Sequence, residues 1–183
     1  MPVLIAMLRA VNLAGRNKVK MEALRELCGS LKFRDARTHL QSGNVVFRAG
    51  GNAAGVALKL ENAIEQSFGF RSSVIVRTPA ELAAVISKNP FAGRDVDPSR
   101  LLVYFLAGEP AAEACSRIPE INAGPEELHL DARELFIHFP NGMGQTKLSL
   151  AKVERMLETS GTGRNWNTVT KLLEIAESLS SGE

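Results

Sequence analysis

The stretch RTHLQSGNVVFR, residues 37–48, decides the fold of this chain. Two short runs, 37–40 and 44–48, flank Gln41-Ser42-Gly43, a polar segment that contains the glycine favoured by a tight turn. The pattern predicts a β-hairpin.

A helix and a strand are predicted on each side of this hairpin. Upstream, residues 2–8 form an apolar strand, and 21–31 carry apolar residues at helical spacing. Downstream, apolar residues recur every four positions from 56 to 68, Gly69 ends that helix, and 72–77 form a strand. The resulting order, βαββαβ, is the split βαβ or ferredoxin-like arrangement.

The second half of the chain repeats most of this order. Thr78-Pro79-Ala80-Glu81 is a capping box that opens a helix through residue 88. The segment 89–99 holds two prolines, a glycine and two aspartates, and it is the predicted linker. The boundary near residue 90 gives an N-terminal half, 1–90, and a C-terminal half, 91–183, with an extra C-terminal helix.

The elements expected in the second half are a strand at 101–107, a helix at 110–118, strands at 127–130 and 135–139, and a helix at 148–157. Residues 161–165, GTGRN, read as a polar connection and not as a fourth strand, and a helix follows them. The sequence therefore predicts an α+β protein with two tandem ferredoxin-like halves, antiparallel sheets and a C-terminal helix.

The composition argues against a membrane protein and against a metal or cofactor site. The 183 residues are 45% hydrophobic and 23% charged, which is typical of an ordinary globular protein. The longest apolar run, 101–107, is too short to cross a bilayer, and no basic leader precedes the first strand, so we expect a cytoplasmic protein without membrane association. Cys28 and Cys115 lie in no metal-binding pattern, so we expect neither metal nor cofactor.

Two polar segments are predicted to meet at one edge of the first sheet. The first and second strands of a split βαβ run parallel, so the loop 9–18 and the turn 41–44 emerge together. Their cations, amides and glycines suit an anion or a polar, planar ligand, with Arg9, Asn12, Gln41, Ser42 and Asn44 as candidate ligand-binding residues. The alternative is a solvated loop beside an ordinary turn.

Two segments of the second half are further candidates. The glycine-rich segment 141–147 joins a strand to a helix, so Lys147 is a candidate phosphate ligand, although the P-loop spacing is absent and a flexible connection is the alternative. Arg164, Asn165 and Thr168 belong to a polar run at the start of the last helix, where an anion can bind. The alternative there is helix capping by Asn165 or Asn167, with Trp166 as an anchor.

Nucleic-acid binding has weak support. The net charge of +2 is small, and the third strand offers a single aromatic residue, Phe47, for stacking on bases. The three histidines lie in predicted strands without a catalytic pattern. Nothing in the sequence indicates the oligomeric state.

Several motifs together resemble one family. They are LRAVN at 8–12 with NKV at 17–19, QSGNVVF at 41–47, NPF at 89–91, and Thr162 with RNWNTV at 164–169. This pattern resembles the bacterial family numbered 1697 among domains of unknown function. The resemblance implies two ferredoxin-like halves and supplies no catalytic residue. Where the family usually has a second glycine before Gly15, this chain has Ala14, which puts a close backbone approach to a ligand in doubt.

The resemblance selects the candidate residues already named in both halves, except Lys147, and their sharing one cleft is a hypothesis. Two function classes follow. One is a binding module for an anionic or nucleotide-like ligand. The other is an enzyme, a transferase or hydrolase acting on a phosphorylated or carbonyl substrate, with Arg9 or Lys147 stabilising charge and Ser42 as nucleophile.

Overall fold

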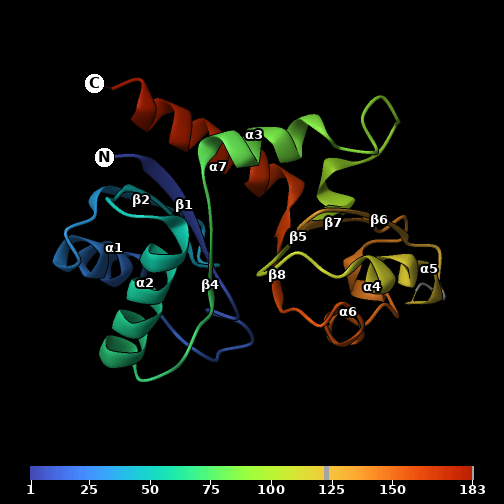
Figure 1. Cartoon of the computed structure of the whole chain (residues 1–183), viewed down its shortest axis with the longest axis horizontal. Helices are drawn as coiled ribbons and strands as arrows, with labels where there is room; N and C mark the ends of the chain where they lie inside the picture. The colour runs from blue at the N-terminus through green and yellow to red at the C-terminus, as the bar shows by residue number, and fades with distance from the viewer. Residues whose placement is uncertain (122–123, 183) are drawn as a thin grey trace. The chain divides into compact units, whose positions relative to one another are not determined.

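The computed structural model describes residues 1–121 and 124–182 (Figure 1). By their internal contacts these residues form two compact units. The first unit comprises Met1–Ala84 together with the residues from Thr170 onward, and the second comprises Val85–Val169. The domain boundary near residue 90 stays a prediction.

The first unit contains a four-stranded antiparallel sheet with the strand order β2-β3-β1-β4. Its strands are β1 Val3–Leu8, β2 Arg34–His39, β3 Asn44–Arg48 and β4 Val74–Arg77. The hairpin of β2 and β3 is confirmed. Strand β2 starts at Arg34, earlier than the predicted start at residue 37. Its register shifts between Arg34 and Arg37, and Asp35 in this irregularity has a φ of 56°.

Two helices, α1 Met21–Ser30 and α2 Ala53–Phe68, pack on one face of this sheet (Figure 1). Leu24 of α1 and Leu60 of α2 are fully buried against sheet residues such as Ala6 and Phe47. Asn52 caps the start of α2 by accepting from the backbone N–H of Gly55, and Gly69 ends it in the left-handed conformation, as predicted.

The capping box before α3, Pro79–Ser87, is also confirmed. The backbone N–H of Glu81 donates to Thr78 Oγ1 at 3.1 Å, and the backbone N–H of Thr78 donates to Glu81 Oε2 at 2.8 Å. These reciprocal bonds satisfy two donors that the first turn of a helix otherwise leaves without partners.

The second unit repeats the topology of the first, with the strand order β6-β7-β5-β8. Its strands are β5 Leu101–Leu106, β6 Glu127–Asp131, β7 Glu134–His138 and β8 Gly161–Asn165. The helices α4 Ala112–Ser116, α5 Ile118–Ile121 and α6 Leu150–Leu157 pack against one face of this sheet (Figure 1). Short 3₁₀ turns at Pro98–Arg100 and Met143–Gln145 connect these elements, and the helix predicted at 110–118 is divided between α4 and α5.

Strand β8 corrects the interpretation of residues 161–165 as a polar connection. It pairs antiparallel with β5, with Tyr104 opposite Gly163 and Phe105 opposite Thr162. A Cβ built on Gly161 lies 2.5 Å from Tyr104 Cε1 and 2.7 Å from the carbonyl oxygen of Phe105. The glycine is therefore required by close packing inside the sheet, and both halves have the complete βαββαβ order.

The last helix, α7 Trp166–Ser180, enters the first unit from Thr170 onward. Arg37 of β2 donates to Ser178 Oγ at 2.9 Å, and Arg48 of β3 donates to the carbonyl oxygen of Leu179. Leu172, Ala176 and Leu179 are buried. Over the described residues, no helix combines the length and apolar character that crossing a bilayer requires.

Candidate functional site

The loop after β1 and the turn between β2 and β3 lie together, as the topology predicted. The backbone N–H of Leu8 donates to the carbonyl oxygen of Gly43 at 2.9 Å. Farther along the loop, Asn12 Nδ2 donates to the carbonyl oxygen of Gln41 at 2.7 Å. Gly43 fits this contact because a Cβ there would lie 2.8 Å from Leu8 Cβ.

Asn12 holds the loop in its shape. Its Nδ2 also donates to the carbonyl oxygen of Val19 at 2.8 Å, while its Oδ1 accepts from the backbone N–H of Val19 at 2.8 Å. Its backbone N–H donates to the carbonyl oxygen of Asn17 at 3.1 Å. The side-chain amide thus ties together the two ends of the loop and the turn. Contact between Asn12 and a ligand stays a prediction.

The loop backbone is unusual in its number of left-handed residues. Positive φ angles occur at Ala10 (54°), Asn12 (53°), Ala14 (48°), Gly15 (76°) and Asn17 (49°). Ala14 and Gly15 are the central residues of a turn that the backbone N–H of Arg16 closes by donating to the carbonyl oxygen of Leu13 at 2.9 Å. Two positive φ angles define a type I′ turn, in which the alanine is the strained residue.

A cavity of about 540 Å³ lies at this loop, and we call it the loop pocket. The loop pocket is lined by Asn12, Gly15, Lys18, Val19, Lys20 and Gln41. Lys18 and Lys20 are exposed on either side of buried Val19. The lining contains two ammonium groups and no carboxylate, so the pocket has a positive electrostatic potential.

The remaining predicted residues of the first unit, Arg9, Ser42 and Asn44, do not line this pocket. Arg9 is half-buried; its backbone N–H donates to the carbonyl oxygen of Ser73 at 2.9 Å, and its carbonyl oxygen accepts from Ser72 Oγ at 2.7 Å. Asn44 is fully buried, and its Nδ2 donates to the carbonyl oxygen of His39 at 3.0 Å and to exposed Ser42 Oγ at 2.9 Å. Asn44 therefore shapes the turn from inside.

The pKa of His39, at the end of β2, is shifted by its surroundings. Partial burial, followed by the positive charge of Lys171 in α7, lowers the pKa of the His39 imidazole. Both causes disfavour the imidazolium form, so His39 is predominantly neutral at pH 7.

The predicted residues of the second unit have mainly structural partners. Arg164 is buried and donates to Thr162 Oγ1 at 2.7 Å and to the carbonyl oxygen of Gly163 at 2.8 Å. Burial lowers the pKa of its guanidinium to about 10. Asn165 Oδ1 accepts from the backbone N–H of Asn167 at 3.0 Å, so the capping interpretation of Asn165 is confirmed. Thr168, in the first turn of α7, is buried.

Lys147 lies in an exposed segment ahead of α6. The helix begins three residues later, and Ser149 Oγ accepts from the backbone N–H of Lys152 at 3.3 Å as its cap. Phosphate binding by Lys147 stays a prediction, as does the sharing of one cleft by the candidate residues of the two units.

Sequence reasoning missed part of the lining of the loop pocket. The lining residues that were not among the predicted ligand-binding residues are Gly15, Lys18, Val19 and Lys20. The available signal was charge distribution, since the first 21 residues contain four cations and no carboxylate. The structure describes no group of three or more His, Cys, Asp or Glu residues, within 1–121 and 124–182, that is arranged to hold a metal ion.

Comparisons with known proteins place the chain in a family. A solved structure of a conserved bacterial protein from Streptococcus pneumoniae superimposes with a TM-score of 0.71 at 21% sequence identity, covering 95% of this chain and 98% of that one. This likeness shows a shared fold. No curated protein matches the chain. Residues 1–136 match the family described as "Protein of unknown function (DUF1697)", which spans well over half of the sequence, and the chain therefore belongs to that family.

Proposed function

We propose that this protein is a binding module for a small anionic or nucleotide-like ligand, and that the loop pocket is its site. The observation that carries the proposal is the pairing of Lys18 and Lys20 at a concave surface without a carboxylate in its lining. The volume of about 540 Å³ falls within the range of small-molecule sites.

Electrostatics favour an anion at this position. A lysine ammonium binds phosphate as a compact point charge, and two of them on one rim reinforce each other. The exposed backbone of the turn at Gly15 adds space for close approach, since nothing lies within 4 Å of a Cβ built there. Both lysines are exposed, so the attraction is screened by salt and the affinity falls as ionic strength rises.

Two exposed apolar side chains, each adjacent in the sequence to a residue that lines the pocket, favour a ligand with a flat or apolar part. Leu13 follows Asn12 and is 65% exposed, and Leu40 precedes Gln41 and is 58% exposed. Large apolar side chains with this exposure in a polar loop and turn offer surface to a base or sugar ring, while the lysines hold its phosphate. A nucleoside monophosphate has both parts.

The test is a thermal-shift and calorimetric titration with AMP, ATP, ribose 5-phosphate and inorganic phosphate at low salt. A ligand that binds only the folded state raises the melting temperature. We expect AMP or ATP to bind more tightly than inorganic phosphate, and the double variant Lys18→Gln/Lys20→Gln to weaken binding about tenfold or more.

The matched control is Lys152→Gln, which removes an exposed lysine from α6 in the second unit. It should leave every affinity unchanged. Equal affinities for the double variant and the wild type, or an absence of binding by all four compounds, would contradict the proposal. Turnover of a bound compound in the same assay would favour the enzyme alternative.

We also propose a cytoplasmic location. It is supported by the two free cysteines, buried Cys28 and half-buried Cys115, since unpaired thiols are typical of reducing compartments. Burial raises the pKa of the Cys28 thiol to about 12, which keeps it unreactive. Cell fractionation with an antibody against the native protein tests this location, and recovery in an extracytoplasmic fraction would refute it.

A further inference from the structure

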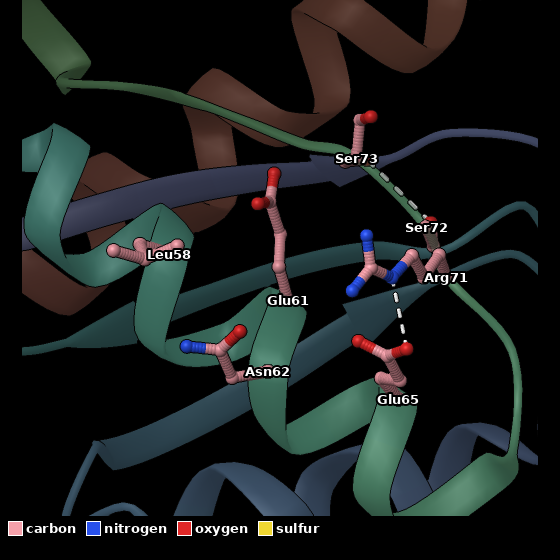
Figure 2. Close-up of a pocket in the computed structure, with 7 residues that line it drawn as sticks. All are labelled: Leu58, Glu61, Asn62, Glu65, Arg71, Ser72 and Ser73. Carbon is pink, nitrogen blue, oxygen red and sulfur yellow. Dashed lines mark hydrogen bonds and ion pairs between the residues drawn. The ribbon is translucent and has the colours of Figure 1, made fainter.

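A second pocket of the first unit lies between α2 and the segment that leads into β4 (Figure 2). We call it the Glu61 pocket. It measures about 350 Å³ and is lined by Leu58, Glu61, Asn62, Glu65, Arg71, Ser72 and Ser73. None of these residues lines the loop pocket, so the two sites are separate.

Glu61 offers a carboxylate that is held by a hydrogen bond to one of its two oxygens. Its Oε1 accepts from the backbone N–H of Val74 at 2.7 Å, and the side chain extends from α2 toward the Ser72–Ser73 segment (Figure 2). Among the residues that the structure describes, this is the carboxylate's one hydrogen bond. The second oxygen keeps its acceptor capacity for a ligand, because a carboxylate accepts through both oxygens.

Arg71 offers the opposite charge, and its guanidinium is likewise held by one hydrogen bond. Its Nε donates to Glu65 Oε1 at 2.8 Å, which orients the guanidinium, and the terminal nitrogens face the side of the pocket where Glu61 stands (Figure 2). Within the described part of the chain, these terminal nitrogens have no acceptor. Their two parallel N–H groups match the geometry of a carboxylate.

Glu61 and Arg71 line the same pocket. The ion pairs of the described residues do not include one between these two side chains. Each is instead oriented by a different neighbour, Val74 for Glu61 and Glu65 for Arg71. A ligand with a single charge is attracted by one of these groups and repelled by the other. A ligand that carries both charges satisfies both groups.

We propose that the Glu61 pocket binds the α-ammonium and α-carboxylate groups of an amino acid. The ligand ammonium donates to the second oxygen of Glu61, and the ligand carboxylate accepts from the terminal nitrogens of Arg71. Leu58, which is 58% exposed at the wall of the pocket, packs against an aliphatic side chain of the ligand. The site is independent of the proposed function of the loop pocket.

The test compares three related compounds by calorimetry at low salt. L-leucine carries both charges, L-leucinamide lacks the carboxylate, and 4-methylpentanoate lacks the ammonium. We expect L-leucine to bind about tenfold or more tightly than either analogue, because each analogue leaves one charged group of the pocket without its partner. In an amide ¹H–¹⁵N NMR titration, L-leucine should shift the resonances of residues 58–74.

Two variants and a control assign the contacts. Glu61→Gln keeps an oxygen that accepts from Val74 N–H and removes the charge, so it should weaken L-leucine binding about tenfold without unfolding the protein. Arg71→Gln, at an exposed position, should do the same. Glu26→Gln is the control, because Glu26 is an exposed residue of α1 outside both pockets.

Three results would overturn the proposal. The first is no binding of L-leucine to the wild type at a concentration of about 10 mM. The second is equal affinity for L-leucine and 4-methylpentanoate. The third is equal loss of affinity in Glu61→Gln and Glu26→Gln.

Discussion

Replacing Gly43 with alanine isolates the contact that brings the turn against the end of β1. Gly43 has a φ of 78°, and its carbonyl oxygen accepts from the backbone N–H of Leu8. Gly15, in the type I′ turn of the neighbouring loop, has nearly the same φ, 76°. Gly43→Ala and Gly15→Ala therefore impose the same backbone strain in different surroundings.

The two surroundings give different expected losses of stability. Placing alanine in the left-handed conformation costs about 1–2 kcal/mol at either position. At Gly43 the new Cβ also lies 2.8 Å from Leu8 Cβ and 3.4 Å from Val11 Cβ, and Leu8 is only 1% exposed. Overpacking of this kind adds about 1–3 kcal/mol. We expect a total of about 2–5 kcal/mol for Gly43→Ala and about 1–2 kcal/mol for Gly15→Ala.

Urea unfolding followed by circular dichroism measures both losses against the wild type. The comparison between the variants is more informative than either value, because the strain common to both cancels. Ligand titrations at the loop pocket provide a second measurement, since displacement of the turn by Gly43→Ala moves the carbonyl oxygen of Gln41 away from Asn12.

Equal free energies of unfolding for the two variants would refute this reasoning. That result would mean that the turn moves away from Leu8 without loss of stability, so the contact does not fix the position of the turn. A larger loss for Gly15→Ala would refute it as well, because nothing lies within 4 Å of a Cβ at that position.

Three further predictions concern single residues. Ala14→Gly should raise the free energy of unfolding in urea by about 0.5–1 kcal/mol. Glycine removes the strain of a 48° φ, and the higher conformational entropy of the unfolded chain offsets part of this stabilisation. Gly161→Ala should destabilise by about 3 kcal/mol or more, since the added Cβ meets the Tyr104 ring and a backbone oxygen, whereas Gly144→Ala, with nothing within 4 Å, should be nearly neutral; equal effects would contradict the packing argument. Glu127→Gln should reduce stability at pH 6, and its difference from the wild type should disappear as pH falls from about 4.5 to about 2. Hydrogen bonds from Arg94, and then from His138, lower the pKa of Glu127 to about 2, so its stabilising charge is present above pH 4.5 and is lost on protonation. A difference that persists at pH 2 would exclude this origin.

The sequence predicted the first half well because local and long-range signals agree there. The turn at Gly43, the apolar runs beside it and the left-handed cap at Gly69 each determine a structure within a few residues. Strand β8 was missed because its glycines and polar residues are those of a turn. It is a strand because it pairs with β5, in which Tyr104, 57 residues before Gly161, also donates from its hydroxyl to the carbonyl oxygen of Gly161 at 3.2 Å.

The candidate site was predictable in position and not in detail. Topology was sufficient to bring the loop and the turn together, because strand direction follows from element order. The partners of Asn12 were not predictable, since its amide has a choice of backbone groups and selects Gln41, 29 residues away, only in the folded chain. The same holds for the Glu61 pocket, where the partner of the carboxylate is a backbone N–H beyond the end of its helix.

The loop pocket and the Glu61 pocket adjoin the same end of the sheet of the first unit, and the strand pairing explains why. Strand β1 is antiparallel to β3 and β4, with Met7 opposite Asn44 and Leu8 opposite Val74, so the end of β1 lies beside the beginnings of its neighbours. Three connections therefore meet there: the loop after β1, the turn before β3 and the segment before β4. The backbone of Arg9 joins them, since it bonds to Ser72 and Ser73 on one side while its loop reaches Gln41 on the other. The helices and strands supply most of the core, to which the loop after β1 adds Val11 and Val19, and most other residues of these connections are not needed to fill it. Polar side chains with unused hydrogen-bonding groups can therefore gather at this end without loss of packing, and a binding function is best sought there.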